Sequence, residues 1–572
     1  MRWVFNYLKP LGKRIAVGIT IKAIGTVAEL MIPFLLTYIL NNVIETENSG
    51  KIVLFGVIMA FCGVVACLGN IIGNRMAAKT TMLFSTRMRE TLFSKTLFLS
   101  ARSTDKFTIP SLESRITSDT YNVQNFIGMM QRMGIRAPML LIGGSIITLI
   151  MDKSLALVMI ATLPFIFAIV YSISRKGVPL YSTVQRSVDG MVRVVREDAN
   201  GIRVIKALSK VDYENERYDK ANLTLKKNET RAGVIMGVVN PIMTLLMNLG
   251  IVAVVGVSAY LVSSGRSSAT TVIAFMQYFT LISMAMMSLS RMFVTYTKCA
   301  ASAKRISGVL DEENELKPIG DSSAISTDAH VSFENVSFSY LGKRDNIKNV
   351  SFSLKRGETL GIIGATGSGK STMLRLLMRF YDASSGTIRI GGRDVRSYSS
   401  DELSAMFGLV LQNDFLYADT IEENIRFGRD IDDEAIVAAT KIAQAYDFIT
   451  SFPDGFQHRV STGGTNLSGG QRQRLLISRA IAGKPEILIL DDSSSALDYK
   501  TDAELRKALS ASLPDSTIIT VAQRVSSVKN CDLILVIDEG EIIGCGKHEH
   551  LLDTCAEYRE ISESQMGGAF LD

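Results

Sequence analysis

A glycine-rich turn between an apolar run and a helical pattern carries the clearest chemistry in the sequence. Residues 364–371 read Gly-Ala-Thr-Gly-Ser-Gly-Lys-Ser, directly after the apolar residues 360–363. Glycines let backbone N–H groups turn toward phosphate oxygens, and the start of the following helix adds the positive end of its dipole. We expect Lys370 to reach the outer phosphates of a nucleoside triphosphate and Ser371 to ligate Mg²⁺. The residues expected around the phosphates are Gly364, Thr366, Gly367, Ser368, Gly369, Lys370, Ser371 and Thr372.

A second motif supplies carboxylates. Residues 487–490 read Ile-Leu-Ile-Leu and lead directly into Asp491 and Asp492. A buried strand that ends in a carboxylate can deliver it to the Mg²⁺ of a bound nucleotide. The order of residues therefore predicts that Asp491 joins Ser371 as a metal ligand.

The elements that position these motifs belong to a soluble α/β domain. From residue 331 onward, short β-type runs alternate with helical segments, which is the pattern of a layered α/β fold. Residues 311–330 are rich in acidic residues, Ser, Gly and Pro, as linkers are. We therefore expect a nucleotide-binding domain over 331–572, a linker over 311–330 and a different domain over 1–310.

The composition shows that this first domain lies in a membrane. The chain has 572 residues, of which 47% are hydrophobic and 21% charged, with a net charge of +6. Its mean hydropathy of +0.22 is high for a soluble protein. The hydrophobicity excludes a disordered chain, and so small a charge excess gives no support for a nucleic-acid partner. Most of the apolar residues lie before residue 310, in runs long enough to cross a bilayer.

We expect six membrane spans with both termini in the cytoplasm. The expected spans are 15–44, 52–74, 121–151, 154–174, 232–265 and 267–290. The short links between them carry few basic residues, whereas the long stretches 75–120 and 175–230 are rich in Lys and Arg and read as helical extensions. The positive-inside rule places those stretches in the cytoplasm of a cell-membrane protein. The six cysteines then fall in reducing surroundings, so no disulfide is expected.

A third motif resembles a known family. Residues 467–471 read Leu-Ser-Gly-Gly-Gln, 20 residues before Asp491, and resemble the signature of ABC ATPases. Other positions agree in order: Tyr340 at the adenine-stacking position, Gln412 at the Q-loop and Ser495 to Asp498 at the D-loop. With six preceding spans, the chain resembles a half-transporter of the ABC exporter type.

The resemblance implies a set of nucleotide-site residues and a dimer. It implies ATP and Mg²⁺ as cofactors, with Ser371, Gln412 and Asp491 at the metal. In the family two ATPase domains meet head to tail, so that each signature completes the partner's site. The signature residues assigned to that role are Leu467, Ser468, Gly469, Gly470 and Gln471, with Asp498 beside them.

Two departures from the family pattern fall on the hydrolytic step. The family usually places Glu after the Mg²⁺-binding Asp, where this chain has Asp492, and a His in the switch loop, where it has Gln523. Asp is one methylene shorter, and Gln carries no titratable proton. A third departure, Thr462, replaces an acidic residue often found before the signature. We expect slow hydrolysis at this chain's own glycine-rich turn and a heterodimer whose partner supplies the competent catalytic residues. A slow homodimer and a nucleotide-gated membrane sensor without transport remain the alternatives.

The expected activity is ATP-driven export of a small amphipathic or hydrophobic compound, which could be a drug, a lipid or a peptide. The spans are rich in methionine, which suits a cavity for varied apolar ligands and also suits ordinary packing. Lys22 and Glu29 are seven residues apart on one face of the first span. The expected contacts between the two domains are 102–110 and 210–213.

Overall fold

The chain folds into two compact units. The structure is a computed structural model and describes residues 2–44, 47–264, 269–313, 316–320, 325–340, 342, 344–493 and 496–566. A helical unit comprises Met1–Phe98 and Phe107–Glu312, and an ATPase unit comprises Leu99–Lys106 and Glu313–Asp572. The second unit therefore includes a short segment from the first third of the sequence.

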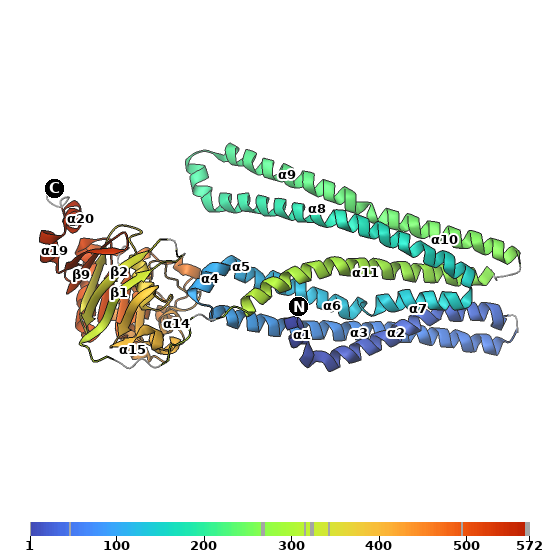
Figure 1. The fold of residues 1–572 in the computed structure, drawn as a ribbon, viewed down its shortest axis with the longest axis horizontal. Coiled ribbons are helices and arrows are strands. Elements are labelled where there is room, and N and C mark those ends of the chain that lie inside the picture. The colour runs from blue at the N-terminus through green and yellow to red at the C-terminus, as the bar shows by residue number, and fades with distance from the viewer. Residues whose placement is uncertain are drawn as a thin grey trace. The chain divides into compact units, whose positions relative to one another are not determined.

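Long helices make up the helical unit (Figure 1). They are α1 (Arg2–Leu8), α2 (Gly12–Tyr38), α3 (Ser49–Leu97), α5 (Ile109–Ser114), α6 (Thr120–Met133), α7 (Arg136–Met151), α8 (Lys153–Ala207), α9 (Val211–Gly237), α10 (Val239–Ser263) and α11 (Ala269–Leu310). Short 3₁₀ or π turns at Lys9–Leu11, Ile39–Val43 and Arg115–Asp119 join some of them. The helical extensions expected over 75–120 and 175–230 are present as the continuations of α3 and α8 and as α9.

Capping side chains start the two longest helices. Asn48 accepts hydrogen bonds from the backbone N–H groups of Gly50 and Lys51 at the start of α3. Asp152 does the same for Ser154 and Leu155 at the start of α8. These short polar residues satisfy N–H groups that have no partner inside the helix. The short links before α3 and α8 therefore also contain the capping residues that start these helices.

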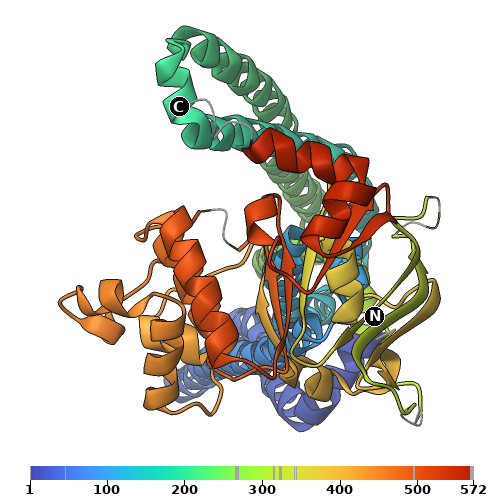
Figure 2. The same ribbon diagram turned by 90° about the vertical axis from the view of Figure 1, so that its left-hand side faces the viewer.

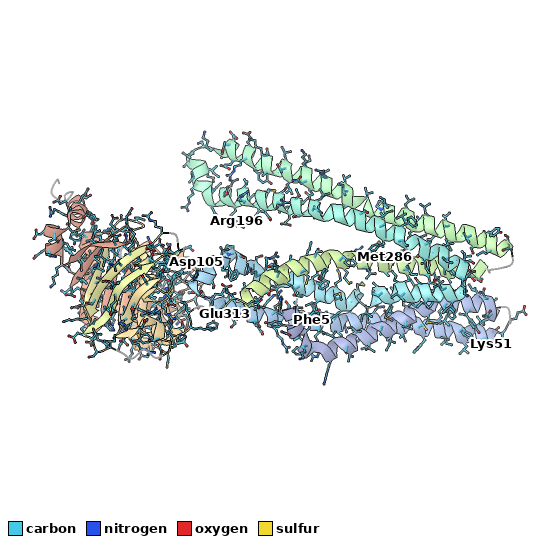
Figure 3. All side chains as sticks on the ribbon, viewed as in Figure 1. Phe5, Lys51, Asp105, Arg196, Met286 and Glu313 are labelled. Atoms are coloured by element: carbon cyan, nitrogen blue, oxygen red, sulfur yellow. The ribbon has the colours of Figure 1, made fainter. Side chains whose placement is uncertain are left out.

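Within the part of the chain that the structure describes, five helical stretches are long and apolar enough to cross a membrane. They are Trp3–Val43, Ser49–Leu97, Ile109–Met151, Thr244–Leu261 and Thr270–Leu310. A shorter apolar stretch, Lys153–Ile169, lies at the start of α8, which runs on unbroken. Several side chains of the expected span 154–174 lie outside the described residues. Lys51 and Arg196 lie at opposite ends of the helical unit (Figure 3).

The expected span 121–151 lies within the apolar stretch Ile109–Met151, but two helices rather than one form it. Helix α6 ends at Met133 and α7 begins at Arg136. Pro138 follows the break and has no N–H to donate to the carbonyl of residue 134, so regular helical bonding cannot pass through this point. Close backbone contact holds α2 against α3, since a Cβ added to Gly69 would lie 2.9 Å from Cα of Gly25.

The ATPase unit contains two sheets. The strands are β1 (Ala329–Phe338), β2 (Ile347–Lys355), β3 (Thr359–Ile363), β4 (Ser385–Ile390), β5 (Arg393–Asp394), β6 (Phe407–Val410), β7 (Ile487–Asp491), β8 (Thr517–Val521), β9 (Leu533–Asp538) and β10 (Glu541–Gly546). Strands β2-β1-β4-β5 form an antiparallel sheet, and β10-β9-β3-β8-β7-β6 form a sheet that is parallel except for β10.

The ATPase unit also contains α-helices. They are α4 (Ala101–Phe107), α12 (Lys370–Leu377), α13 (Ser400–Ala405), α14 (Ile421–Arg426), α15 (Asp433–Ile442), α16 (Tyr446–Thr450), α17 (Gly469–Ile481), α18 (Tyr499–Ser512), α19 (His548–Thr554) and α20 (Ala556–Met566). Figure 2 shows the orange helices of residues 421–481 gathered to one side of the strands. Alternate side chains of β7 and β8 enter two different apolar clusters, because successive residues of a strand face opposite ways.

Candidate nucleotide site

Parallel strands bring the sequence motifs to one edge of the sheet. Strands β3 and β7 both pair with β8, and the register sets Asp491 and Ile362 beside Val521. The glycine-rich turn follows β3, the two aspartates end β7, and Gln523 follows β8. Segments far apart in the sequence therefore meet where the carboxyl ends of these strands lie, which is the usual ligand edge of an α/β sheet.

The glycine-rich turn has a shape that only glycines allow. Gly367 and Gly369 adopt φ of 86° and 108°. A Cβ on Gly369 would lie 2.8 Å from the carbonyl oxygen of Asn346, and one on Gly364 would lie 2.1 Å from that of Ile537. Helix α12 begins at Lys370, so the turn leads directly into a helix N-terminus. This is a backbone cradle for phosphate oxygens.

Lys370 folds back over its own turn. Its Nζ donates hydrogen bonds to the carbonyl oxygens of Gly364 at 2.9 Å and Ala365 at 2.7 Å. Burial lowers the pKa of Lys370, and the nearby Asp491 and Asp492 partly oppose that effect. Within the same turn, the hydroxyl of Ser368 is buried and has no hydrogen-bond partner among the described residues. A lysine held by carbonyls and an unsatisfied hydroxyl both fit a triphosphate.

Two candidate metal ligands are already in contact. The hydroxyl of Ser371 donates to a carboxylate oxygen of Asp491 at 2.9 Å. Mg²⁺ prefers oxygen ligands and usually takes one or two from the protein and others from phosphate and water. Among the described residues no three His, Cys, Asp or Glu side chains gather to hold a metal by themselves. Ser371 and Asp491 therefore fit an Mg²⁺ that arrives with a nucleotide, and Gln412 lies exposed two residues beyond the end of β6.

The two adjacent aspartates lie in different surroundings. Asp491 is buried, and burial raises its pKa in spite of the bond from Ser371. Asp492 is half-buried in a left-handed backbone conformation with φ of 51°. Burial raises the pKa of Asp492 as well, while Arg524 and Lys370 oppose the rise. The amide of Gln523 donates to Asp492 Oδ2 at 3.4 Å, so the two departures from the family pattern touch each other.

The expected adenine-stacking residue has an aromatic support. Tyr340 is half-buried, with Phe338 and Tyr381 edge-on at ring distances of 4.8 and 5.1 Å. Its hydroxyl donates to Thr372 Oγ1 at 3.3 Å and accepts from Arg375 at 3.2 Å. The ring is thus tied to the first turn of α12, beside the glycine-rich turn.

The signature residues form the start of a helix. Ser468 caps α17 through a reciprocal pair of bonds with Gln471, and Ser468 and Gly469 are exposed. Leu467 and Gly470 are half-buried, and a Cβ on Gly470 would lie 3.2 Å from the carbonyl oxygen of Ala496. Exposed N–H groups at a capped helix start can receive an anion.

Gln473 links three motifs, and its role was not predicted. Its amide donates to the backbone oxygen of Asp492 at 3.4 Å, and its Oε1 accepts from the backbone N–H of Ala496 at 3.1 Å. The signature helix, Asp492 and the D-loop are therefore joined through one side chain. The sequence did contain one signal for this role, because Gln473 lies one turn beyond Gly469 and therefore on the same face of the helix. Asp498 caps α18, and Ser495 lies outside the described residues.

Part of one expected coupling region belongs to the ATPase unit. Residues Leu99–Lys106 belong to that unit, and the hydroxyl of Tyr381 donates to Asp105 at 2.5 Å. Burial and the bond to Asp105 raise the pKa of Tyr381. Because Tyr381 also packs against Tyr340, α4 is connected to the expected adenine position through two rings. The other region, 210–213, starts α9 in the helical unit, where Tyr213 is exposed.

Charged side chains on α2 have polar partners on the neighbouring helices. Arg136 on α7 makes two hydrogen bonds to Glu29 on α2, at 2.7 and 3.2 Å. Lys22 is buried and donates to Asn74 on α3 at 2.8 Å. An open cavity of about 480 Å³ lies beside Glu29, between α2 and α11, and Met276 and Met284 line it. Other methionines, such as Met159 and Met286, are buried in the core of the helical unit, and the side chain of Met243 lies outside the described residues.

Comparisons with known proteins agree with this arrangement. Residues 15–286 match the profile of the ABC transporter transmembrane region, and residues 347–495 match that of the ABC transporter family. The chain is 33% identical to the uncharacterized ABC transporter ATP-binding protein YfiB of Bacillus subtilis over 99% of both chains. It is 31% identical to the uncharacterized ABC transporter ATP-binding protein Rv1273c of Mycobacterium tuberculosis, over 98% of this chain and 97% of that one.

A solved structure shares the fold. A bacterial Atm1-family ABC exporter with ATP bound superposes with a TM-score of 0.83 at 24% identity, over 96% of this chain and 98% of the other. The chain belongs to the ABC transporter family. It carries a transmembrane region and an ATPase domain in one polypeptide, with the fold of an exporter half-transporter, and the expected fold class is confirmed.

Proposed function

We propose that this protein is one half of an ATP-driven exporter that moves small amphipathic or hydrophobic compounds out across the cell membrane. Its termini and the ends of α3, α8 and α9 that carry many Lys and Arg residues lie in the cytoplasm. The open cavity between α2 and α11 supports such a cargo, because it combines methionine side chains with the polar groups of Gln277 and Thr280.

The ATPase unit binds ATP with Mg²⁺ at the glycine-rich turn. Lys370 leaves its carbonyl partners for the outer phosphates, and Ser371 and Asp491 hold the metal with Gln412. Tyr340 stacks on the adenine. When bound, Mg²⁺ neutralises charge that develops on the phosphates. The unsatisfied hydroxyl of Ser368 and the positive φ of Gly367 and Gly369 support this assignment.

The single observation that carries the rest of the proposal is the contact between Asp492 and Gln523. Asp492 stands where a base would orient the attacking water, and its carboxylate is one methylene short of the usual reach. Gln523 can donate a hydrogen bond but cannot take or give a proton at neutral pH. General acid–base assistance contributes about 10²- to 10⁴-fold, so this site holds ATP and hydrolyses it slowly.

The signature supports a heterodimer. Ser468 keeps its capping box and its exposure, so it can complete a site on a second chain. A partner half-transporter with an intact base and switch residue then hydrolyses ATP at that second site. Two identical copies of this chain would instead form two slow sites.

The test uses the full chain in lipid nanodiscs, alone and together with a half-transporter encoded beside it. We expect the chain alone to bind Mg-ATP with little turnover and the pair to hydrolyse it at least tenfold faster. The Ser468→Ala variant should abolish the gain. Rapid hydrolysis by this chain alone would overturn the heterodimer. Dye uptake into inverted vesicles containing the pair that is the same with and without ATP would overturn export.

A further inference from the structure

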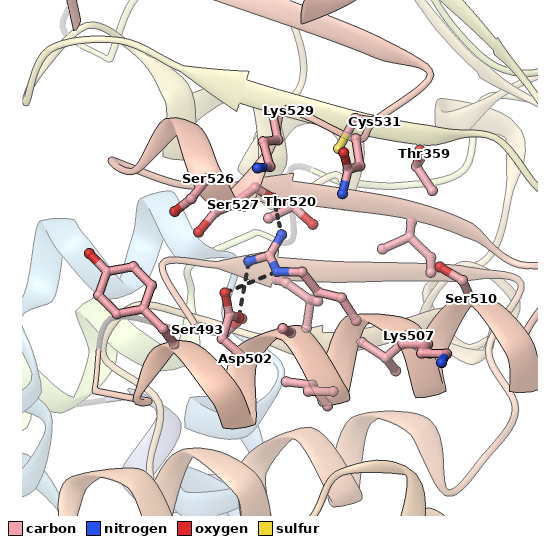
Figure 4. Close-up of a pocket in the computed structure, with 18 residues that line it drawn as sticks. Thr359, Ser493, Asp502, Lys507, Ser510, Thr520, Ser526, Ser527, Lys529 and Cys531 are labelled. Carbon is pink, nitrogen blue, oxygen red and sulfur yellow. Dashed lines mark hydrogen bonds and ion pairs between the residues drawn. The ribbon is translucent and has the colours of Figure 1, made fainter. Parts of the chain in front are cut away.

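A groove in the ATPase unit lies outside the nucleotide site. It has a volume of about 510 Å³, within the range of small-molecule sites. Its floor is one face of the parallel sheet, with Leu490 of β7 and Ile518 and Thr520 of β8. Helix α18 forms one wall, and the segment 525–531 forms the other (Figure 4).

The groove exists because two apolar clusters cover this face without meeting. Leu505 and Leu509 of α18 pack into the cluster that contains Leu490. Val525 and Val528 pack into a separate cluster with the C-terminal helices. Between them the groove reaches the sheet, where the largely buried Leu490 and Ile518 give it an apolar floor.

A polar strap crosses the groove. Arg506 on α18 makes two hydrogen bonds to Asp502, at 3.0 and 3.1 Å, and donates another to the backbone oxygen of Ser527 on the opposite wall (Figure 4). The strap uses the one carboxylate among the described residues that line the groove. Because Arg506 neutralises Asp502, the remaining charge of the lining comes from the lysines.

Two lysines give the groove a net positive charge. Lys507 follows Arg506 on α18, and Lys529 lies across the groove on the other wall (Figure 4). Neither lysine is in an ion pair with any residue that the structure describes. Hydroxyls of Ser510 and Ser526 lie along the same walls, and Ser493, shortly after the end of β7, also lines the groove. An apolar floor below two cations and several hydroxyls favours an organic anion with an apolar body.

The groove also borders the nucleotide site. Ser493 directly follows Asp492, and α18 starts at its cap, Asp498. Tyr499 also lines the groove, and the centroid of its ring lies 5.3 Å from the guanidinium carbon of Arg524, the residue after Gln523. An occupant that contacts both walls therefore fixes the D-loop helix relative to the segment after the switch position.

We infer that this groove is a binding site for a small organic anion, a carboxylate, phosphate or sulfonate carried on an apolar body, held by Lys507 and Lys529. The inference concerns the ATPase unit of this chain and holds whichever compound is exported and whichever partner is used.

The test measures binding of naphthalene-1,5-disulfonate to the full chain in nanodiscs by equilibrium dialysis. Saturating Mg-ATP is present so that the glycine-rich turn is filled, and empty nanodiscs supply the blank. We expect saturable binding that falls at least tenfold in Lys507→Glu and in Lys529→Glu. The matched control is Lys500→Glu, a charge reversal on the same helix at a residue outside the groove, which should bind within twofold of the parent chain.

Folding of each variant is checked by its melting temperature, and Lys529→Arg, which keeps the charge, should retain binding. Absence of saturable binding at millimolar probe would overturn the site. Equal binding by the parent chain and both glutamate variants would also overturn it. Loss of binding when Mg-ATP is added, or in Lys370→Ala, would assign the probe to the phosphate cradle instead.

Discussion

The amide of Gln523 donates a hydrogen bond to the carboxylate of Asp492 at 3.4 Å, just beyond the carboxyl ends of the paired strands β8 and β7. Both side chains occupy positions that act on the γ-phosphate in the family pattern. Their contact means that neither is free to act alone, since a change in one alters the partner of the other. A restored site therefore needs both substitutions.

The Asp492→Glu, Gln523→His double variant should hydrolyse ATP about 10- to 100-fold faster than the parent chain, because a longer carboxylate reaches the attacking water and a histidine can contact the γ-phosphate. Phosphate release by the nanodisc-embedded protein measures it. Asp492→Asn, Gln523→His is the control and should remain slow. An unchanged rate in the restored variant would show that these two positions do not limit turnover.

Replacing Asp491 should stabilise the nucleotide-free protein. Burial raises the pKa of Asp491 above its ordinary 3.8, so the folded state binds the proton more tightly than the unfolded state does. Ionisation at neutral pH thus disfavours folding, and the stability from this group, fully present below its unfolded-state pKa, is lost as pH rises through its higher folded-state pKa. We expect Asp491→Asn to raise the melting temperature at pH 7.5, with a gain that shrinks as pH is lowered toward 4.5. Asp502→Asn, which loses the pair with Arg506, should show no such gain.

The contact between Asp105 of α4 and Tyr381, inside the ATPase unit, can be tested by removing a single hydroxyl. Tyr381→Phe keeps the ring beside Tyr340 and removes the bond to Asp105. A hydrogen bond to a charged group contributes about 1.5–3 kcal/mol. We expect a lower melting temperature and weaker stimulation of ATP turnover by transported dye, with ATP affinity within twofold of the parent chain. Full dye stimulation in this variant would remove the bond from the coupling path.

A buried carboxylate holds α11 against the segment before α6. Asp119 is buried and accepts hydrogen bonds from Ser302 and from Arg305, each at 2.8 Å. The Arg305→Gln variant leaves this charge with a weaker partner and should lower the free energy of unfolding by about 1–3 kcal/mol, since Arg305 is half exposed. Asp119→Asn in the Arg305→Gln background should recover part of the loss. Chemical denaturation of the four proteins of this cycle gives the coupling energy.

Two substitutions of the capping residue Ser468 can distinguish its effect on the stability of α17 from its effect on catalysis. Ser468→Thr keeps a hydroxyl for the N–H of Gln471, whereas Ser468→Ala removes it and should destabilise α17 by about 1 kcal/mol. With a competent partner present, we expect Ser468→Ala to lose most ATP turnover and Ser468→Thr to keep a measurable part of it. Equal turnover in the two variants would show that the cap does not set the geometry of the shared site.

Local patterns predicted the elements and missed their contacts. The spacing of glycines before Lys370 and the apolar run before Asp491 were sufficient to place both motifs at strand ends, because each depends on residues next to one another. The break between α6 and α7 was not predicted, although Pro138 marks it, because the apolar pattern continues across the interruption. Pairings such as Glu29 with Arg136, or Asp105 with Tyr381, join residues more than 100 positions apart and depend on packing that no local pattern contains.

The short segment Leu99–Lys106 has a consequence for exchanging parts between transporters. It lies between α3 and α5 in the sequence, yet it folds with the ATPase unit. A hybrid made by joining two proteins at residues 311–330 would therefore set a foreign eight-residue insert, with its Asp105, against a native Tyr381. A working hybrid should therefore take Leu99–Lys106 from the same protein as its ATPase unit. The part that can be exchanged as one piece thus consists of two separate segments of the sequence.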